Sequence, residues 1–140
     1  MAKTVDSTEL VELANALTLR IYGHFMARAA ELNLTSAEAK ALQHLAPERA
    51  MPMRELAARL HANPSNVTVV VARLEARGAL SREESVDRRV KGVRLTPAGV
   101  KLRAKLEARL LADHPATRGL SAAEKRQLQQ LLHKLAEQEL

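Results

Sequence analysis

The 140-residue sequence predicts a mainly helical fold of the α+β class, in which two short strands form one hairpin. Three observations predict it. Apolar residues recur at helical spacing along most of the chain, whereas the alternation typical of a half-buried strand is confined to the stretch around Val93. Capping residues precede several of the helical runs. Tyr22 and Phe25 are the only aromatic residues, so the core must be aliphatic.

Residues 7–33 are expected to form one long helix, because apolar positions spaced by three or four residues share one side. On another face Arg20, His24 and Arg28 recur every fourth residue. Such a stripe could receive an anionic ligand, although a solvated face or pairing with carboxylates is the more common outcome. The apolar side comprises Leu10, Leu17, Ile21, Phe25 and Ala29.

The next helix is predicted to begin at a capping box, in which Thr35 and Glu38 satisfy each other's backbone donors. Pro47 and Pro52 bracket the connector that follows. Residues 53–60 then form a short helix with Leu56, Ala57 and Leu60 on its apolar side.

A further helix is expected over residues 64–77, between two strong boundary markers. Asn63 is a suitable N-cap, Pro64 suits the first turn, and Gly78 suits a left-handed C-terminal cap. The β-branched run 67–71 would also fit a buried strand, but both markers favour the helix. The outward side chains of this helix are then Ser65, Asn66, Thr68, Val69 and Arg73.

Residues 79–84 and 91–95 are predicted to pair as the hairpin, with Asp87, Arg88 and Arg89 at its charged tip. Two helices joined by the three-residue turn 61–63 make a helix-turn-helix, whose second helix can enter the major groove of DNA. With the hairpin added, residues 34–96 are predicted to be a winged helix-turn-helix lobe with a two-stranded wing.

After the wing, two more helices are expected within residues 97–139, because Thr96-Pro97 and a capping box at Ser121 mark two starts. These helices and residues 7–33 would find little to cover them within one lobe. We therefore expect them to pack against a second copy as a helical dimerisation region. An intramolecular bundle is the alternative. A dimer would place the two second helices about one DNA turn, ~34 Å, apart.

Composition narrows the classes of function. The net charge is +6, and residues 53–95 hold nine basic against five acidic side chains, which suits a phosphate backbone. Single-stranded nucleic acid is disfavoured, because an aromatic stacking platform is missing. The sequence has no cysteine, no catalytic motif and no membrane-length apolar run. We expect a cytoplasmic protein that is not an enzyme and holds no metal or cofactor.

Several short motifs in one order resemble the MarR family of bacterial transcription regulators. They are Ser65-Asn66-Val67-Thr68, then the run from Arg73 to Arg82, then Asp87-Arg88-Arg89, and finally Val93 to Gly99. Leu34-Thr35 with Leu42 and Leu45 resembles the family's entry into the preceding helix. Two positions depart from the family pattern. Val69 stands where a polar or basic residue is common, and His61 where a glycine is common.

The resemblance implies a homodimer that binds a near-palindromic operator in double-stranded DNA, usually as a repressor released by a small molecule. It places the family's minor-groove arginine at Arg89 and its supporting carboxylate at Asp87. Ser65, Asn66, Thr68 and Val69 would meet base edges, with Arg73 reaching a base or a phosphate. Arg88 and Lys91 would add to the basic surface.

The resemblance also implies a pocket between the first helix and the lobe for a small anionic or aromatic effector. Its candidate lining residues are Arg20, His24 and His44. Neither His24 nor His44 has a second strong ligand at metal-binding spacing, so a structural role is the more common reading.

Two other functions remain compatible with the pattern. A winged helix can serve as a protein-interaction module, although such a module has no need of Arg88 and Arg89 at a hairpin tip. An architectural protein that coats DNA would keep the basic charge but show no palindromic preference. The operator, the regulated genes and the choice between repression and activation are not encoded in any motif.

The wing assignment leads to a first prediction. Arg89→Ala should weaken operator binding by ~1–3 kcal/mol, because an arginine in the minor groove would be lost. Asp87→Ala should cost less, because it removes only the group that orients the arginine. Affinity measured by fluorescence anisotropy checks both, and unchanged affinity in both variants would contradict the assignment.

Overall fold

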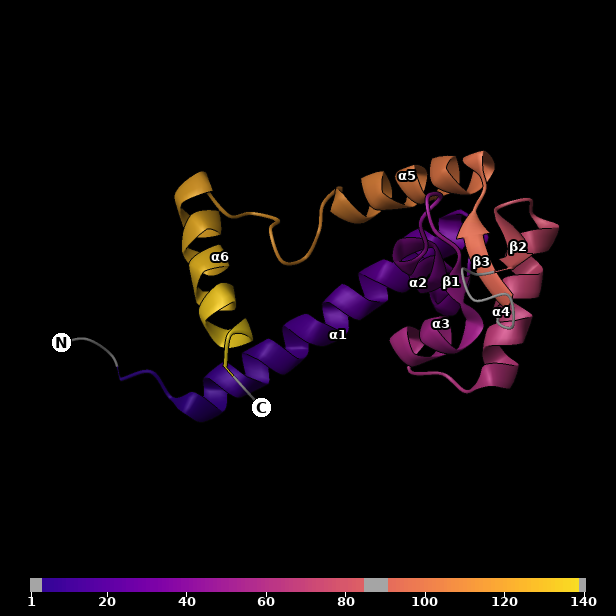
Figure 1. The fold of residues 1–140 in the computed structure, drawn as a ribbon. Helices are drawn as coiled ribbons and strands as arrows, with labels where there is room; N and C mark the ends of the chain where they lie inside the picture. Colours follow the sequence, from indigo (N-terminus) through magenta and orange to yellow (C-terminus); the bar gives the residue numbers. More distant parts are fainter. Residues whose placement is uncertain (1–3, 85–90, 139–140) are drawn as a thin grey trace. The chain divides into compact units, whose positions relative to one another are not determined.

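The computed structural model describes residues 4–84 and 91–138, and its fold is mostly helical with one small antiparallel sheet (Figure 1). The winged-helix arrangement predicted above is confirmed. The elements in chain order are α1 (Ser7–Glu31), α2 (Ser36–His44), β1 (Met51–Pro52), α3 (Met53–Leu60), α4 (Pro64–Ala76), β2 (Leu80–Glu84), β3 (Lys91–Leu95), α5 (Pro97–Leu111) and α6 (Ala122–Ala136).

The chain divides into two compact units. The larger unit, residues 25–112, holds the end of α1, the sheet and helices α2 to α5. The smaller unit combines residues 4–24, most of α1, with residues 113–138, which include α6.

The sheet has three strands in the order β1-β3-β2, where two were expected. The predicted hairpin pairs Leu80 with Leu95 and Arg82 with Val93. The additional strand β1 pairs Met51 with Val93 on the other side of β3. Sequence patterning missed β1 because two residues show no alternation, and because Pro52 is tolerated only where a strand lies at a sheet edge.

The core of the larger unit is aliphatic, as the scarcity of aromatic residues predicts. α2, α3, α4, the sheet and α5 each contribute to it, and Phe25 is only half-buried at its margin. The largest fully buried side chains are Leu42, Leu45, Leu56, Val67, Val71, Leu74, Val93, Leu95 and Leu106.

Three structural transitions meet at one junction: the end of α4, the start of β2 and the start of α5. Gly78 ends α4 with a left-handed backbone (φ +74°), as its position predicts. The Ala79 carbonyl accepts a hydrogen bond from the Thr96 backbone N–H at 3.0 Å, and the Thr96 hydroxyl donates to the Gly78 carbonyl. A Cβ on Gly99 would lie 2.0 Å from the Ala79 carbonyl oxygen, so this approach admits only glycine.

Two arginines hold the C-terminal ends of α1 and α2. The Arg77 guanidinium donates to the carbonyls of Leu32 and Asn33, each at 2.9 Å. Arg103 on α5 donates to the Leu45 carbonyl at 2.6 Å. These carbonyls follow the last residue of each helix, so the two arginines satisfy backbone acceptors that no helical hydrogen bond reaches.

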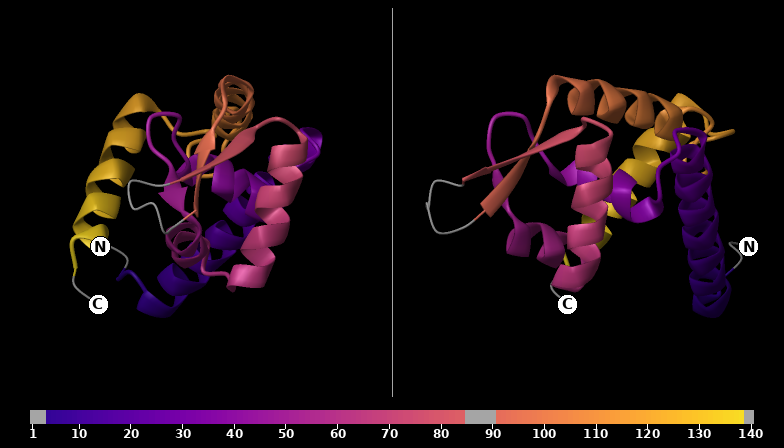
Figure 2. Two further views of the ribbon diagram at one scale, coloured as in Figure 1. Left: turned by 45° about the vertical axis from the view of Figure 1, so that its right-hand side comes forward. Right: turned by 90° about the vertical axis from the view of Figure 1, so that its right-hand side faces the viewer.

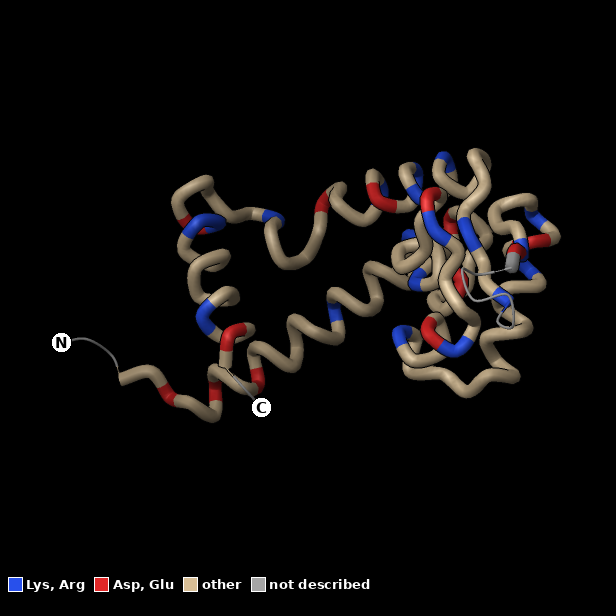
Figure 3. The backbone as a smooth tube through the Cα atoms, in the orientation of Figure 1, with Lys and Arg blue, Asp and Glu red and all other residues tan. Residues whose placement is uncertain are grey.

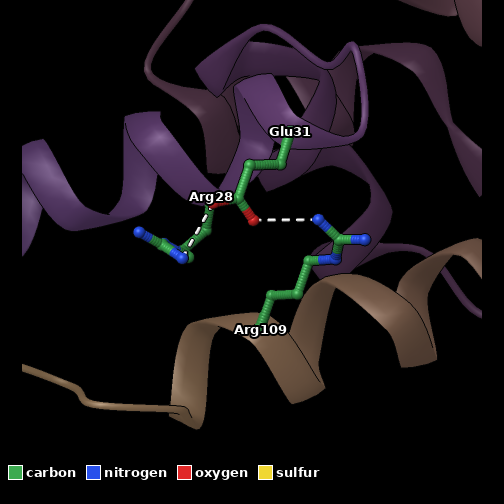
Figure 4. A network of polar contacts seen from close by, with 3 residues as sticks. All are labelled: Arg28, Glu31 and Arg109. Carbon is green, nitrogen blue, oxygen red and sulfur yellow. Dashed lines mark hydrogen bonds and ion pairs between the residues drawn. The ribbon is translucent and has the colours of Figure 1, made fainter.

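A third arginine contact links α1 with α5 (Figure 4). Glu31 accepts from Arg109 at 2.9 Å and pairs with Arg28 at 2.8 Å. Arg28, the last member of the basic stripe on α1, therefore pairs with a carboxylate, the more common of the two outcomes considered for that stripe.

The smaller unit has little core of its own. α6 contains no buried residue, and large apolar side chains stand exposed on both α1 and α6. The His24 and His114 rings meet edge to face, with centroids 5.2 Å apart, and His114 Nδ1 accepts from the Ala116 N–H. The exposed side chains include Leu10, Leu13, Leu19, Leu131, Leu132 and Leu135.

The junction yields the second prediction. Gly99→Ala should lower the free energy of unfolding by about 1–3 kcal/mol, because its methyl group forces α5 away from the Ala79 carbonyl. Gly23→Ala is a matched control, since a Cβ there meets nothing within 4 Å and the position is inside a helix. It should raise stability by about 0.5–1 kcal/mol. Urea denaturation at equal protein concentration measures both, and equal effects would contradict the steric account.

Candidate DNA-binding interface

Helix α4 is the element around which the candidate interface is built, and its start is held by one side chain. Asn63 Oδ1 accepts from the Asn66 backbone N–H at 3.0 Å and from the Ser65 hydroxyl at 2.7 Å. Pro64 occupies the first turn, where no backbone donor is needed. The helical prediction for residues 64–77 is confirmed, and the strand alternative for residues 67–71 is wrong.

The two sides of α4 differ as the spacing predicts. Val67, Val71 and Leu74 are buried, and Val70 is half-buried. Val69 is 51% exposed, although valine is usually an interior residue. All five predicted candidates are exposed: Ser65, Asn66, Thr68, Val69 and Arg73. Ala72 and Glu75 of the same helix are exposed as well. The Thr68 hydroxyl donates to the Pro64 carbonyl at 3.0 Å, which leaves its oxygen able to accept.

The turn between α3 and α4 adopts the backbone that the sequence requires. His61 ends α3 with φ +50° and ψ +40°, a left-handed conformation. Histidine tolerates this region better than most residues do, so the departure from glycine at this position is accommodated. α3 and α4 therefore form a helix-turn-helix.

A hollow of about 360 Å³ lies against residues 66–73 of α4. Its walls come from the start of α2, the end of α3 and the exposed side of α4. Ser36 and Lys40 of α2 thereby share a surface with Asn66, Val69 and Arg73. Sequence analysis missed the contribution of α2, because the capping box at Thr35 marks where that helix starts but not which helix it faces.

Figure 3 marks the positions of Lys and Arg in blue and of Asp and Glu in red along the backbone. Most of the described arginines near α4 and the sheet have a carboxylate or carbonyl partner. Arg59 pairs with Glu55 at 3.1 Å, Arg82 with Glu75 at 3.2 Å, and Arg94 with Glu83. The Arg77 guanidinium donates hydrogen bonds to the two carbonyls that follow α1. Within residues 53–84 and 91–95, the cations with no recorded partner are Arg54, Arg73 and Lys91, all of them exposed.

The predicted wing contacts are placed only in part. Lys91 is exposed at the first position of β3. Asp87, Arg88 and Arg89 lie outside the described residues. Their assigned roles stay predictions.

The three candidate effector residues do not fall in one unit. Arg20 is exposed and His24 half-buried in the smaller unit, whereas His44, exposed at the end of α2, belongs to the larger one. Over residues 4–84 and 91–138, no group of three His, Asp or Glu side chains is arranged to hold a metal ion. In the same ranges, no helix combines the length and the apolar character needed to cross a membrane.

The geometry agrees with what comparisons with known proteins find. Residues 34–91 match the model of the MarR family. Apo MarR of Escherichia coli superimposes with a TM-score of 0.78 at 21% identity, covering 95% of this chain and 98% of that one. No curated protein sequence matches.

Two further similar structures were solved with ligands. A MarR-family protein of Mycobacterium tuberculosis, in complex with p-aminosalicylic acid, has a TM-score of 0.71 and 27% identity over 91% of this chain and 98% of that one. CouR of Rhodococcus jostii, bound to p-coumaroyl-CoA, has a TM-score of 0.70 and 25% identity over 99% of both chains. The fold is that of MarR-family transcription regulators.

The cap of α4 gives the third prediction. Asn63→Ala should destabilise the protein by ~1 kcal/mol, because the backbone N–H of Asn66 loses its acceptor. Asn63→Asp keeps an acceptor and places a negative charge at the positive end of α4, so its stability should equal or exceed that of the wild type. Thermal unfolding followed by circular dichroism tests the pair, and equal losses in the two variants would exclude a capping role.

Proposed function

We propose that this chain, whose residues 34–91 belong to the MarR family, is a transcription regulator that binds double-stranded DNA sequence-specifically as a homodimer. α4 would enter the major groove of each half-site of a near-palindromic operator. The wing would reach the adjacent minor groove through Arg89, oriented by Asp87. Repression from a cytoplasmic location, with release by a small molecule, completes the proposal.

The observation that carries this proposal is the exposed side of α4. A helix held by a side-chain cap and a buried valine-leucine stripe presents short polar side chains, an exposed Val69 and an arginine without a recorded partner among the described residues. Asn66 has the donor and acceptor needed for adenine, and Val69 suits a thymine methyl group. A helix that served only to complete the core would not need short side chains and an exposed valine on its solvent side.

The dimer is supported by the smaller unit. Its exposed leucines on α1 and α6 form apolar surface that water solvates poorly. A second copy would cover both helices and set the spacing of the two α4 helices, which a palindromic operator requires.

The proposed effector is a small anionic or aromatic molecule. Support comes from the two ligand-bound relatives, one holding an aromatic carboxylic acid and the other an aromatic acyl-CoA. Arg20 and His24 of the smaller unit and His44 of the larger unit each remain proposed as residues that contact such a molecule.

A selection of duplexes from a random pool, at stated salt, tests the proposal and gives the fourth prediction. The wild type should enrich a near-palindrome with half-sites about one turn, ~34 Å, apart. Arg73→Gln should lower affinity for the enriched duplex by ~1–3 kcal/mol, because a base or phosphate contact is lost. Arg109→Gln, which removes the same charge from α5, is the control and should bind like the wild type.

The remaining outcomes separate the alternatives. Binding without enrichment would replace the proposal with an architectural DNA-binding protein. Absence of binding to any duplex would replace it with a protein-interaction module.

A further inference from the structure

We propose that Arg82 is an additional DNA-backbone contact and that Glu75 is the residue that positions it. The inference rests on the proposed function and adds a phosphate contact to the same interface, at a position that neither the outward face of α4 nor the wing tip supplies. Its ligand is a DNA phosphate that lies outside the contact between α4 and β2, beside the exposed part of the Arg82 side chain.

Arg82 lies on the inner face of the sheet. Arg82 is paired with Val93 and is two residues from Leu80, so all three side chains share one face. Val93 and Leu80 are buried in the core beside α4, and β2 packs against α4. Arg82 therefore extends from the inner face of the sheet toward α4, with its side chain 39% exposed.

The Arg82 side chain reaches Glu75 on α4. Its Nε lies 3.2 Å from Glu75 Oε2, and the Glu75 side chain is 43% exposed. Thr68, Ala72 and Glu75 are spaced by four and three residues, so they share one face of α4, and all three are exposed. Thr68 is a proposed DNA contact. Arg82 thus lies on the side of α4 that faces the wing and continues the proposed interface toward it.

The contact with Glu75 orients the Arg82 guanidinium. Glu75 accepts from Nε, whereas the two terminal nitrogens supply the paired donors that match a phosphate bidentately. A fork whose direction is already set loses less entropy when it binds. The carboxylate also cancels the charge of Arg82 in the free protein, so arbitrary DNA gains little from it.

Three other arginines with partners do not combine a position beside α4 with an orientation that a carboxylate sets. Arg77 donates two hydrogen bonds to backbone carbonyls and is committed to the fold. Arg94 pairs with Ser81 in register, so it and its partner Glu83 lie on the opposite face of the sheet from Arg82. Arg109 on α5 pairs with Glu31 on α1 (Figure 4), so its partner does not belong to α4.

The decisive measurement is fluorescence anisotropy of the full-length protein with two labelled duplexes over a salt series. One duplex is the sequence that the wild type enriches, and the other is a scrambled sequence of equal length and composition. Arg82→Gln should weaken binding to the enriched duplex about tenfold. It should also reduce the slope of log affinity against log salt by about one. Arg82→Lys should restore the slope but not the full affinity, because it keeps the charge and loses the fork.

Glu75→Gln separates positioning from simple charge. It should weaken binding to the enriched duplex about threefold, because Arg82 loses its orientation, while binding to the scrambled duplex stays equal or tightens. Its double variant with Arg82→Gln should match Arg82→Gln alone, as expected for residues that act as one unit. Arg109→Gln is the matched control and should leave affinity and slope unchanged. Circular dichroism confirms that each variant is folded.

The outcomes distinguish the two levels of the proposal. If the wild type enriches a duplex and Arg82→Gln binds it like Arg109→Gln, the contact at Arg82 is wrong while the proposed function stands. Equal gains of Glu75→Gln on both duplexes, or additive losses in the double variant, would overturn the positioning role. If the wild type binds neither duplex, both the proposed function and this inference fail.

Discussion

The approach of α5 to the Ala79 carbonyl is the constraint on which the winged lobe depends. Within a few residues, α4 ends at Gly78, β2 departs, and α5 starts against the same backbone. The missing Cβ of Gly99 lets the two backbones approach, and Thr96 satisfies the polar groups that this approach would otherwise strand. Because α4 and the sheet leave from this one point, their relative direction is set there (Figure 2). The proposed DNA-binding interface depends on this relative direction, because it combines side chains of α4 with side chains of the wing.

The number of arginines in the winged lobe overstates the positive charge that is available to DNA, because several of them are bound to protein groups. The sequence predicts a basic surface from an excess of arginine, but several of those arginines support the fold. Arg77 donates to the carbonyls that follow α1 and Arg103 to the carbonyl that follows α2, so both guanidinium groups are bound to backbone instead of phosphates. Fewer cations are therefore available to contact DNA, and binding specificity depends on the direction in which these side chains point.

The two units differ in how much of their apolar surface is buried. Residues 25–112 enclose an aliphatic core in which three helices, a sheet and α5 each bury a stripe. Residues 4–24 and 113–138 expose leucines on two helices, and no residue of α6 is buried. Such surface is stabilised when another apolar surface covers it, which gives the proposed dimer a physical reason.

By itself, the sequence determined the elements that local chemistry specifies. Asn63, Thr35, Thr96 and Ser121 placed helix starts, and the valine spacing placed the buried side of α4. β1, the hollow shared by α2 and α4, and the pairing of Arg82 with Glu75 were decided only by tertiary structure. Each joins residues that are distant along the chain or on different elements, where periodicity carries no information about which surfaces meet. Capping and periodicity are local, whereas the partners of a charged side chain are chosen by packing.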